Sequence, residues 1–284
     1  HMVYGISEGE GFLMCVGEIG TGKTTLSRVL MQKLGDSSIY SHVLNPFQDF
    51  VTLIKNMITD FGLTPVGDDK SALIDQLINF LLNDVAPRGK NALVIIDEAQ
   101  NLSVETLEQL RLISNIETNK EKLIQILLLG QEELAHKLAM NELRQLNQRI
   151  SVRYFLRPLG LRDMAAYVYH RIKIAEPRQP ITFTASALRE MYKFSRGVPR
   201  LINMIAHRCL IAGFVGESNK IDRSMVKRAK ESLYGEKYKK IKKMKTKRWP
   251  WNTVWFSALR GKPVHTPDKN LAEEPLDEQP GINN

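Results

Sequence analysis

The sequence of 284 residues contains few cysteines, few aromatic residues and no long apolar run. Its two cysteines, Cys15 and Cys209, are too few for a disulfide-stapled secreted domain. Two distant thiols favour a reducing compartment, with the cytoplasm as the default. The longest apolar run, residues 123–129, is far shorter than the roughly 18 residues of a membrane-spanning helix. No charged-then-apolar leader precedes the first strand pattern, so we expect no secretory signal.

The composition that is present is ordinary for a globular protein. Hydrophobic residues make up 43% of the chain and charged residues 25%, which excludes wholesale disorder and a collagen-like repeat. The net charge is +9, and eleven Lys and Arg against two Glu between residues 227 and 248 account for the whole excess. The rest of the chain is therefore neutral, and its charge gives no support for nucleic-acid binding there.

Strand and helix patterns alternate along the first 160 residues. Apolar runs of strand length alternate with helical patterns, which is typical of a parallel sheet with helices on both faces. Ser103 precedes one helix as an N-cap, with Glu105 in its first turn. We therefore predict an α/β fold with a parallel five-stranded sheet. The expected strands are residues 11–17, 39–44, 92–96, 124–129 and 152–156, and the expected helices are 23–34, 50–61, 71–82 and a segment after Ser103.

After Pro158 the strand patterns stop. Helical patterns follow at residues 162–174, 184–195, 199–214 and 224–233. The last 25 residues contain four prolines and several acidic side chains, a composition that does not form a packed core. We expect an α/β domain over residues 1–159, a small all-helical domain over 160–235, and a flexible basic and aromatic tail over 236–284.

A glycine-rich turn joins the first strand to the first helix. Residues 17–24 match G-x-x-x-x-G-K-[ST], in which backbone N–H groups surround a phosphate because glycine has no Cβ in the way. The lysine ammonium bridges the β- and γ-phosphates at the positive end of the helix, and the hydroxyl holds Mg²⁺. We predict an ATP and Mg²⁺ site, with a plain glycine-rich turn as the alternative. Its residues are Gly17, Glu18, Ile19, Gly20, Thr21, Gly22, Lys23 and Thr24.

Two carboxylates, Asp97 and Glu98, follow the expected strand 92–96. The carboxyl ends of parallel strands form the edge of the sheet at which ligands bind. Asp97 is suited to support Mg²⁺, and Glu98 to polarise the water that attacks the γ-phosphate. Gln131 follows the strand 124–129, so we expect it between the other two strands, in contact with the γ-phosphate. The alternative for Gln131 is a residue that only begins a helix.

Three arginines are candidates to complete this site. Arg200 lies in the first turn of a helix, where a positive charge is unfavourable unless an anion such as ATP is nearby. Arg149 and Arg144 precede the fifth strand, and either could reach the γ-phosphate of a neighbouring subunit as an arginine finger. Arg149 is the candidate that we favour. The alternative for Arg200 is an exposed arginine without a ligand, and the alternative for Arg149 and Arg144 is a surface salt bridge.

These motifs, in this order, resemble those of AAA+ ATPases, and more narrowly those of the general secretion pathway protein A (ExeA-type) ATPases. The phosphate loop and Asp97-Glu98 are common to the superfamily. The neighbourhoods of residues 101–102, 114–115 and 130–131 suggest the narrower group. The matching stretches are residues 4–5, 11–12, 17–25, 96–102, 108–115, 130–134, 142–146 and 197–203.

The resemblance implies a nucleotide-binding AAA+ core, a helical lid, and ATP hydrolysis between the subunits of a homo-oligomer. It adds Thr25 to the nucleotide-binding residues, and it makes Asn45 the residue that restrains the catalytic glutamate. It implies that ATP turnover at the cytoplasmic side of the inner membrane drives assembly of a secretion or pilus (secretin) complex through a protein partner. Transposition regulators, which bind DNA as ATP-dependent filaments, resemble the same core. That alternative stays open, as does a nucleotide-gated scaffold that hydrolyses ATP only slowly by itself.

The basic run at residues 237–248 is followed by three tryptophans and a phenylalanine at residues 249–256. A polybasic run beside aromatic residues favours an anionic membrane surface, on which this short segment could lie without spanning it. The same residues could instead neutralise DNA phosphates, stack on bases, or form a solvated linker. Of these, the membrane surface is the interpretation that we prefer.

Overall fold

The computed structural model describes the backbone of residues 2–44, 46, 49–115 and 122–244, and their side chains except those of Asp36 and residues 234–244. Residues 1–233 form one compact unit. Asn45, the aromatic residues at 249–256 and the rest of the chain after Met244 lie outside the described residues. Predictions that concern them are therefore untested by the structure.

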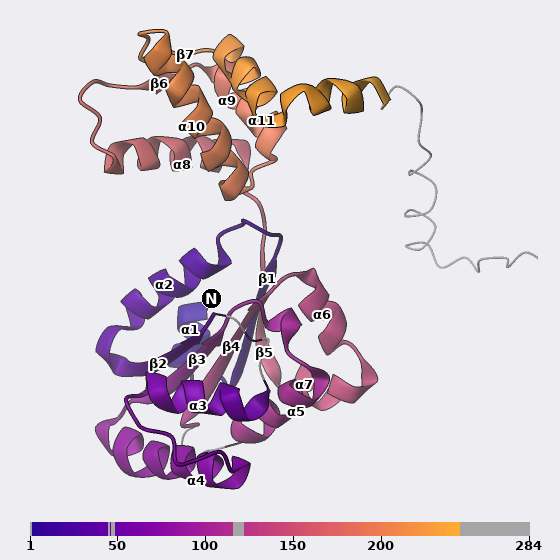
Figure 1. The fold of residues 1–284 in the computed structure, drawn as a ribbon. Coiled ribbons are helices and arrows are strands. Elements are labelled where there is room, and N and C mark those ends of the chain that lie inside the picture. The colour runs from indigo at the N-terminus through magenta and orange to yellow at the C-terminus, as the bar shows by residue number, and fades with distance from the viewer. Residues whose placement is uncertain (1, 45, 47–48, 116–121, 245–284) are drawn as a thin grey trace, which may run out of the picture. The chain divides into compact units, whose positions relative to one another are not determined.

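The predicted parallel sheet is present, with five strands in the order β2-β3-β4-β1-β5 (Figure 1). Every neighbouring pair is parallel, so all strands end at the same edge. The order puts β4 between β3 and β1, as the prediction for Gln131 requires. The strands are β1 Phe12–Gly17, β2 Ser38–Val43, β3 Asn91–Ile96, β4 Ile124–Gly130 and β5 Ile150–Leu156.

Helices cover both faces of the sheet. Side chains alternate along each strand, so Val94 and Ile96 of β3 belong to one apolar cluster, whereas Leu93 and Ile95 belong to another. Helices α1 and α2 complete the second cluster, and α3 to α7 contribute to the first. The helices are α1 Met2–Ser7, α2 Lys23–Leu34, α3 Phe50–Asp60, α4 Lys70–Phe80, α5 Val104–Ile113, α6 Glu132–Leu138 and α7 Arg144–Arg149.

Helix starts follow from local side-chain chemistry. Ser103 accepts a hydrogen bond from the backbone N–H of Thr106, which confirms it as the N-cap of α5. Asp49 and Asp69 cap α3 and α4 in the same way. Helices α1, α6 and α7 have no counterpart in the sequence prediction, because segments of six or seven residues are too short to show a helical period.

Both cysteines are buried free thiols. Burial raises the pKa of Cys15 to about 11 and that of Cys209 to about 12. Both thiols therefore stay protonated at neutral pH and act as apolar side chains of the core.

The part of the chain after Pro158 has its own apolar cluster, built from residues between Met164 and Ala229. Its helices are α8 Leu161–Ile174, α9 Ala185–Ser195, α10 Pro199–Val215 and α11 Arg223–Met244. The prediction of an all-helical unit overlooked two strands, β6 Thr182–Phe183 and β7 Lys220–Ile221, which pair in parallel. Strands of two residues leave no alternating pattern in the sequence.

Helix α11 is longer than the sequence suggested. The sequence pattern predicted a helix over residues 224–233, and the backbone stays helical to Met244. The flexible tail expected from residue 236 stays a prediction. Lysine and glutamate are good helix formers and no proline occurs before Pro250, so the single Gly235 disfavours the helix by only about 1 kcal/mol without ending it. Among the helices that the structure describes, none is long and apolar enough to cross a membrane.

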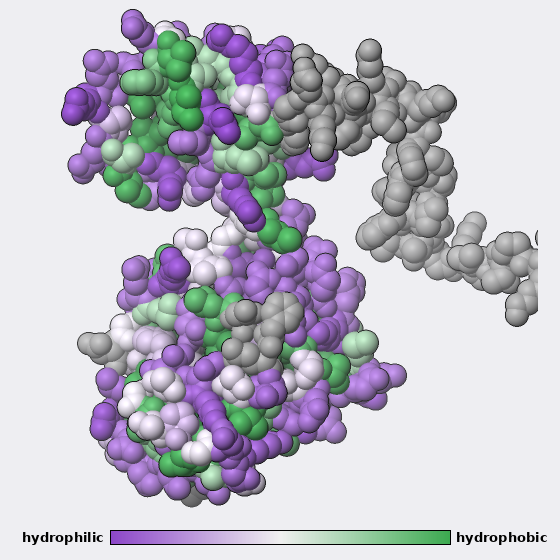
Figure 2. All heavy atoms as spheres, viewed as in Figure 1, coloured by the Kyte–Doolittle hydropathy of each residue, from purple (hydrophilic) through white to green (hydrophobic). Residues whose placement is uncertain are grey.

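Large apolar side chains are exposed on α8 and α10. Phe214 and Val215, at the end of α10, are 86% and 77% exposed, and Ile174 ends α8 with 65% exposed. Figure 2 shows hydrophobic residues gathered on this helical part in the view drawn. Exposed apolar surface of this kind is typical of protein–protein contacts.

A backbone hydrogen bond between Leu159 and Gly197 links the segment after β5 to the helical part. The N–H of Leu159 donates to the carbonyl of Gly197 at 2.9 Å. Gly197 has a φ of +83°, and a Cβ built on it would lie 1.9 Å from the carbonyl oxygen of Leu159. Only glycine fits this position without a shift of the backbone.

Replacing Gly197 with alanine is therefore expected to lower the free energy of unfolding by at least about 2 kcal/mol, through strain at a positive φ and a clash with backbone. Urea unfolding followed by circular dichroism measures this. Gly160→Ala is the matched control, because the nearest atom to its Cβ is 3.3 Å away and belongs to the side chain of Asp163. Equal stability of the two variants would contradict the prediction.

Candidate active site

The predicted phosphate loop connects β1 to α2. Gly20 and Gly22 have φ values of +81° and +102°, which favour glycine. A Cβ on Gly17 would lie 2.6 Å from the carbonyl oxygen of Leu156, so this position also needs glycine. No side chain caps the start of α2 at Gly22, which leaves the first N–H groups of the helix for an anion.

Lys23 is buried, with 6% of its surface exposed. Its ammonium donates to the carbonyls of Gly17 at 2.8 Å and Glu18 at 3.1 Å. A buried ammonium satisfied only by loop carbonyls can exchange them for phosphate oxygens. The side chain is thus already folded into the loop that is expected to surround the phosphates.

The other predicted loop residues lie around this lysine. Thr21 donates from its backbone N–H and its hydroxyl to the carbonyl of Glu18, at 3.3 and 2.8 Å, and thereby closes the turn. Ile19 and Thr25 are exposed. Glycines at the bends and small polar residues between them leave the backbone amides free to approach an anion.

Thr24 and Asp97 meet across the sheet edge. The Thr24 hydroxyl donates to Oδ2 of Asp97, which is 4% exposed. Both were predicted to hold Mg²⁺, and the fold brings them into direct contact from the start of α2 and the end of β3. Mg²⁺ is usually held by one or two protein oxygens together with substrate phosphates, and a hydroxyl beside a buried carboxylate fits this requirement.

Glu98 lies directly after Asp97 in a left-handed conformation, with a φ of 53°. Its Oε2 accepts from the side-chain amides of Gln100 at 2.6 Å and Gln131 at 3.1 Å. Burial acts to raise the pKa of Glu98, but the two amide donors and the charge of Lys23 outweigh it, so the pKa lies below its usual value. The carboxylate is therefore charged at neutral pH and can accept a proton.

Gln131 lies at the end of β4, and its side-chain amide donates to Glu98. Its expected contact with the γ-phosphate stays a prediction. Gln131 also stands at the N-cap position of α6, but its side chain makes no cap hydrogen bond and reaches Glu98 instead. The alternative, a residue that only begins a helix, therefore does not account for its side chain.

Gln100 is a site residue that the sequence reasoning missed. It lies in the short turn Ala99–Asn101, two residues after Glu98, and contacts both Glu98 and Gln131. A glutamine two residues after a catalytic carboxylate is a weak signal, because the chain could point its side chain in any direction there.

Arg200 is placed against the phosphate loop. Its backbone N–H donates to the carbonyl of Gly20 at 3.1 Å, and a Cβ on Gly20 would lie 2.6 Å from the Cβ of Arg200. Pro199 is the first residue of α10, which puts Arg200 in the first turn as predicted. Its side chain is exposed, beside the loop that is expected to bind phosphate.

Arg149 and Arg144 lie away from the loop. Helix α7 begins with Arg144 and ends with Arg149 at the start of β5, whereas the phosphate loop follows the end of β1. The seven residues of β5 separate the two edges by about 20 Å, at roughly 3.3 Å per residue. Neither arginine can reach a phosphate bound to its own loop.

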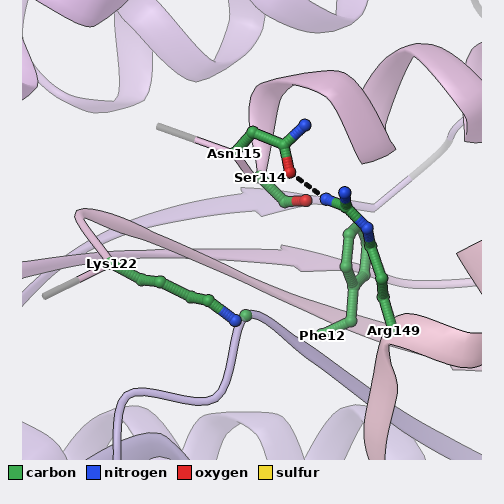
Figure 3. A pocket seen from close by; sticks show the side chains of 6 residues that line it. Phe12, Ser114, Asn115, Lys122 and Arg149 are labelled. Carbon is green, nitrogen blue, oxygen red and sulfur yellow. Dashed lines mark hydrogen bonds between the residues drawn. The ribbon is translucent and has the colours of Figure 1, made fainter. Parts of the chain in front are cut away.

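Arg149 lines a pocket of about 280 Å³ at this opposite edge (Figure 3). Its guanidinium donates to Oδ1 of Asn115, and Lys122 extends into the same pocket from the chain before β4. The remaining described lining residues are Gly11, Phe12 and Ser114. Two cationic side chains thus lie where another molecule could present an anion.

Comparison with known proteins concerns the family and the fold of this chain. A family model described as an AAA domain matches residues 6–138. General secretion pathway protein A of Aeromonas hydrophila is 44% identical over 223 residues, which cover 78% of this chain but only 40% of that protein. The chain therefore spans well under half the length of that relative.

Solved structures share the fold. The ORC2 protein of Aeropyrum pernix, in ADPNP–ADP complexes, superimposes with a TM-score of 0.59 at 17% identity, covering 80% of this chain and 63% of that one. Cdc6p of Pyrobaculum aerophilum gives a TM-score of 0.63 at 16% identity, covering 81% and 65%. At such identities the likeness concerns the fold alone. The chain therefore has the AAA+ P-loop fold, with an AAA domain at residues 6–138, and resembles general secretion pathway protein A.

Proposed function

We propose that this protein hydrolyses ATP to ADP and phosphate in the presence of Mg²⁺. The observation that carries this proposal is the contact of the phosphate loop with the acidic strand end, through Thr24 and Asp97, beside a charged Glu98. Lys23 binds the β- and γ-phosphates. Thr24 and Asp97 would hold Mg²⁺, and the ion would supply positive charge to the phosphates.

Hydrolysis needs a base that takes a proton from the attacking water. Glu98 accepts a proton from a water molecule as the water oxygen bonds to the γ-phosphorus, and the bond from that phosphorus to the β–γ bridging oxygen breaks. Gln131, which lies beside Glu98, donates to the γ-phosphate, and Arg200 neutralises phosphate charge from the start of α10. Thr25 and the loop amides complete the nucleotide site, and Asn45 remains a candidate for restraint of Glu98.

Phosphate release from ATP tests this proposal, with Mg²⁺ or with excess EDTA. Turnover that depends on Mg²⁺ supports it, and no turnover at any protein concentration contradicts it. Duplex-DNA affinity, measured with a slowly hydrolysed ATP analogue and with ADP, tests the alternative of a DNA-binding regulator. Much tighter binding with the analogue would favour that alternative, whereas nucleotide-independent binding is the ordinary behaviour of a basic segment.

The ATPase is proposed to act as a homo-oligomer in which Arg149 serves the site of the neighbouring copy. Its place at the sheet edge opposite the phosphate loop supports an action between subunits. The exposed apolar side chains of α8 and α10 provide surface for such assembly.

Arg149→Ala is expected to lower kcat by at least about 100-fold and to leave ATP affinity within about threefold, because the charge acts only on the transition state of a neighbour. Mixing it with Glu98→Gln should restore turnover, since some interfaces then pair an intact Glu98 with an intact Arg149. Phosphate release from the mixture measures this. A mixture no more active than its parts would contradict the assignment. Arg144→Ala tests the competing finger candidate in the same assays.

The cellular role is proposed by likeness to general secretion pathway protein A, with 44% identity over 223 residues. ATP turnover would drive assembly or remodelling of a secretion or pilus complex, with a protein partner there. The basic run that begins in α11 would hold the ATPase at the cytoplasmic face of the inner membrane. Binding to anionic liposomes, compared with neutral ones, tests this placement.

A further inference from the structure

We propose that Gln100 is a positioning residue that holds Glu98 in the orientation required to take a proton from water, an inference that rests on the proposed ATPase function. Its amide nitrogen donates to Oε2 of Glu98 at 2.6 Å. Its amide oxygen accepts the backbone N–H of Gln131 at 3.1 Å. A single side chain thus joins the two residues that are expected to act on the water and on the γ-phosphate.

The backbone N–H of Gln131 determines which end of the Gln100 side-chain amide faces Glu98. Because the N–H of Gln131 needs an acceptor, the oxygen of Gln100 points to it, and the nitrogen points to the carboxylate. The opposite orientation would bring two donors together at Gln131 and two acceptors together at Glu98. The network therefore places a donor, and not an acceptor, against the carboxylate.

The backbone around Gln100 is itself held firmly. Lys137 donates to the carbonyls of Gln100 and of Leu102, the latter at 2.8 Å. Ala99 and Leu102, on either side, are fully buried. Gly130 leaves the space for the amide, because a Cβ there would lie 2.9 Å from Oε1 of Gln100. A long side chain with fixed ends has little freedom to release Glu98.

Both amides reach the same oxygen of Glu98. Gln100 and Gln131 donate to Oε2, and among the residues that the structure describes no hydrogen bond reaches Oε1. Oε1 is thus the atom left to accept the proton of the attacking water. If Gln131 turns its amide to the γ-phosphate, Gln100 still holds Oε2, so the base keeps its orientation when ATP is bound.

Gln100→Glu tests this role with little change in shape. The new carboxylate still accepts the N–H of Gln131, but it replaces the donor on Glu98 with a like charge. Repulsion between the two carboxylates raises the pH at which the pair loses its last proton, and Glu98 is a free base beside the charged new carboxylate only above that pH. We expect the acid limb of the kcat profile to move up by at least about one pH unit, and kcat at pH 7 to fall about tenfold or more. KM for ATP should stay within about threefold, because Gln100 does not contact the phosphate loop.

Gln100→Met is the second variant, which keeps the length of the side chain and removes both hydrogen bonds. It should lower kcat about tenfold, with a smaller upward move of the acid limb. Gln109→Glu is the matched control, because the half-buried Gln109 donates to the exposed Glu105 at 2.9 Å, one turn earlier on α5. It makes the same chemical change beside a glutamate outside the site and should leave the profile unchanged.

A wild-type pH profile in both Gln100 variants would overturn the inference, as would an equal loss of ATP binding and kcat, which indicates a purely structural role. The variant Glu98→Gln distinguishes failure of the positioning role of Gln100 from failure of the proposed ATPase function. If Glu98→Gln is inactive and the Gln100 variants behave as wild type, only the positioning role is wrong. If Glu98→Gln still turns over ATP normally, the proposed function is wrong as well.

Discussion

Glu98→Gln is expected to abolish ATP turnover while ATP remains bound. The amide keeps the shape of the side chain and its place beside Gln100 and Gln131. It cannot accept the proton of the attacking water, and loss of a general base lowers the rate by about 100- to 10,000-fold. The phosphate loop is not touched, so the Kd for ATP should change by less than about threefold.

Phosphate release and fluorescent-nucleotide titration measure the two quantities on the same preparation. Glu105→Gln is the control, because Glu105 is an exposed glutamate in the first turn of α5 that also accepts from a glutamine. It should keep turnover within about twofold, as expected for a surface substitution. Turnover of Glu98→Gln within tenfold of the wild type would show that another group activates the water.

Lys23→Met is expected to lose ATP binding without loss of the fold. The ammonium supplies charge-assisted hydrogen bonds to the phosphates, so its removal should weaken ATP binding by about 100-fold. The same change removes a buried cation that is satisfied in the free protein only by the carbonyls of Gly17 and Glu18. The stability of the nucleotide-free protein should therefore be equal or higher.

Lys23→Met is thus expected to weaken ATP binding without lowering the stability of the nucleotide-free protein, so the two measurements distinguish loss of a ligand contact from loss of the fold. ATP at about 100 times its Kd should raise the free energy of unfolding of the wild type by about 2.7 kcal/mol, and the variant should lose this shift. Thermal unfolding with and without ATP and Mg²⁺ measures both. Lys33→Met, in the exposed last turn of α2, is the matched control and should keep the full shift. A variant that binds ATP as the wild type would exclude Lys23 from the phosphate site.

Patterns over a few neighbouring residues were enough to predict much of the fold. Helix α2 runs from Lys23 to Leu34 as the pattern predicted, and Ser103 caps α5, because a helical period and a cap act over a few residues. The inner strands β1, β3 and β4 were identified because both of their faces are buried, which requires continuous apolar runs. The edge strands β2 and β5 are only partly buried, and their signal in the sequence is weaker. Elements too short for a period, such as α7 and β6, were missed.

The candidate site was predictable in part. The phosphate loop and Asp97-Glu98 are contiguous motifs, so their residues could be read from the sequence before any fold was known. The strand order was needed to bring Gln131 to Glu98, and the turn at Ala99–Asn101 was needed to bring Gln100 to both. Contacts between separate segments depend on chain folding, which no local pattern records.

By itself, the sequence determined that this chain has a phosphate loop, an acidic strand end and an alternating α/β order, because each depends on residues near one another in the chain. Only the tertiary structure decided that Arg149 faces away from its own phosphate loop and that Gly197 must be glycine beside Leu159. It also decided that two glutamine amides converge on one oxygen of Glu98. These features depend on the direction of side chains from distant segments, which packing of the whole unit sets.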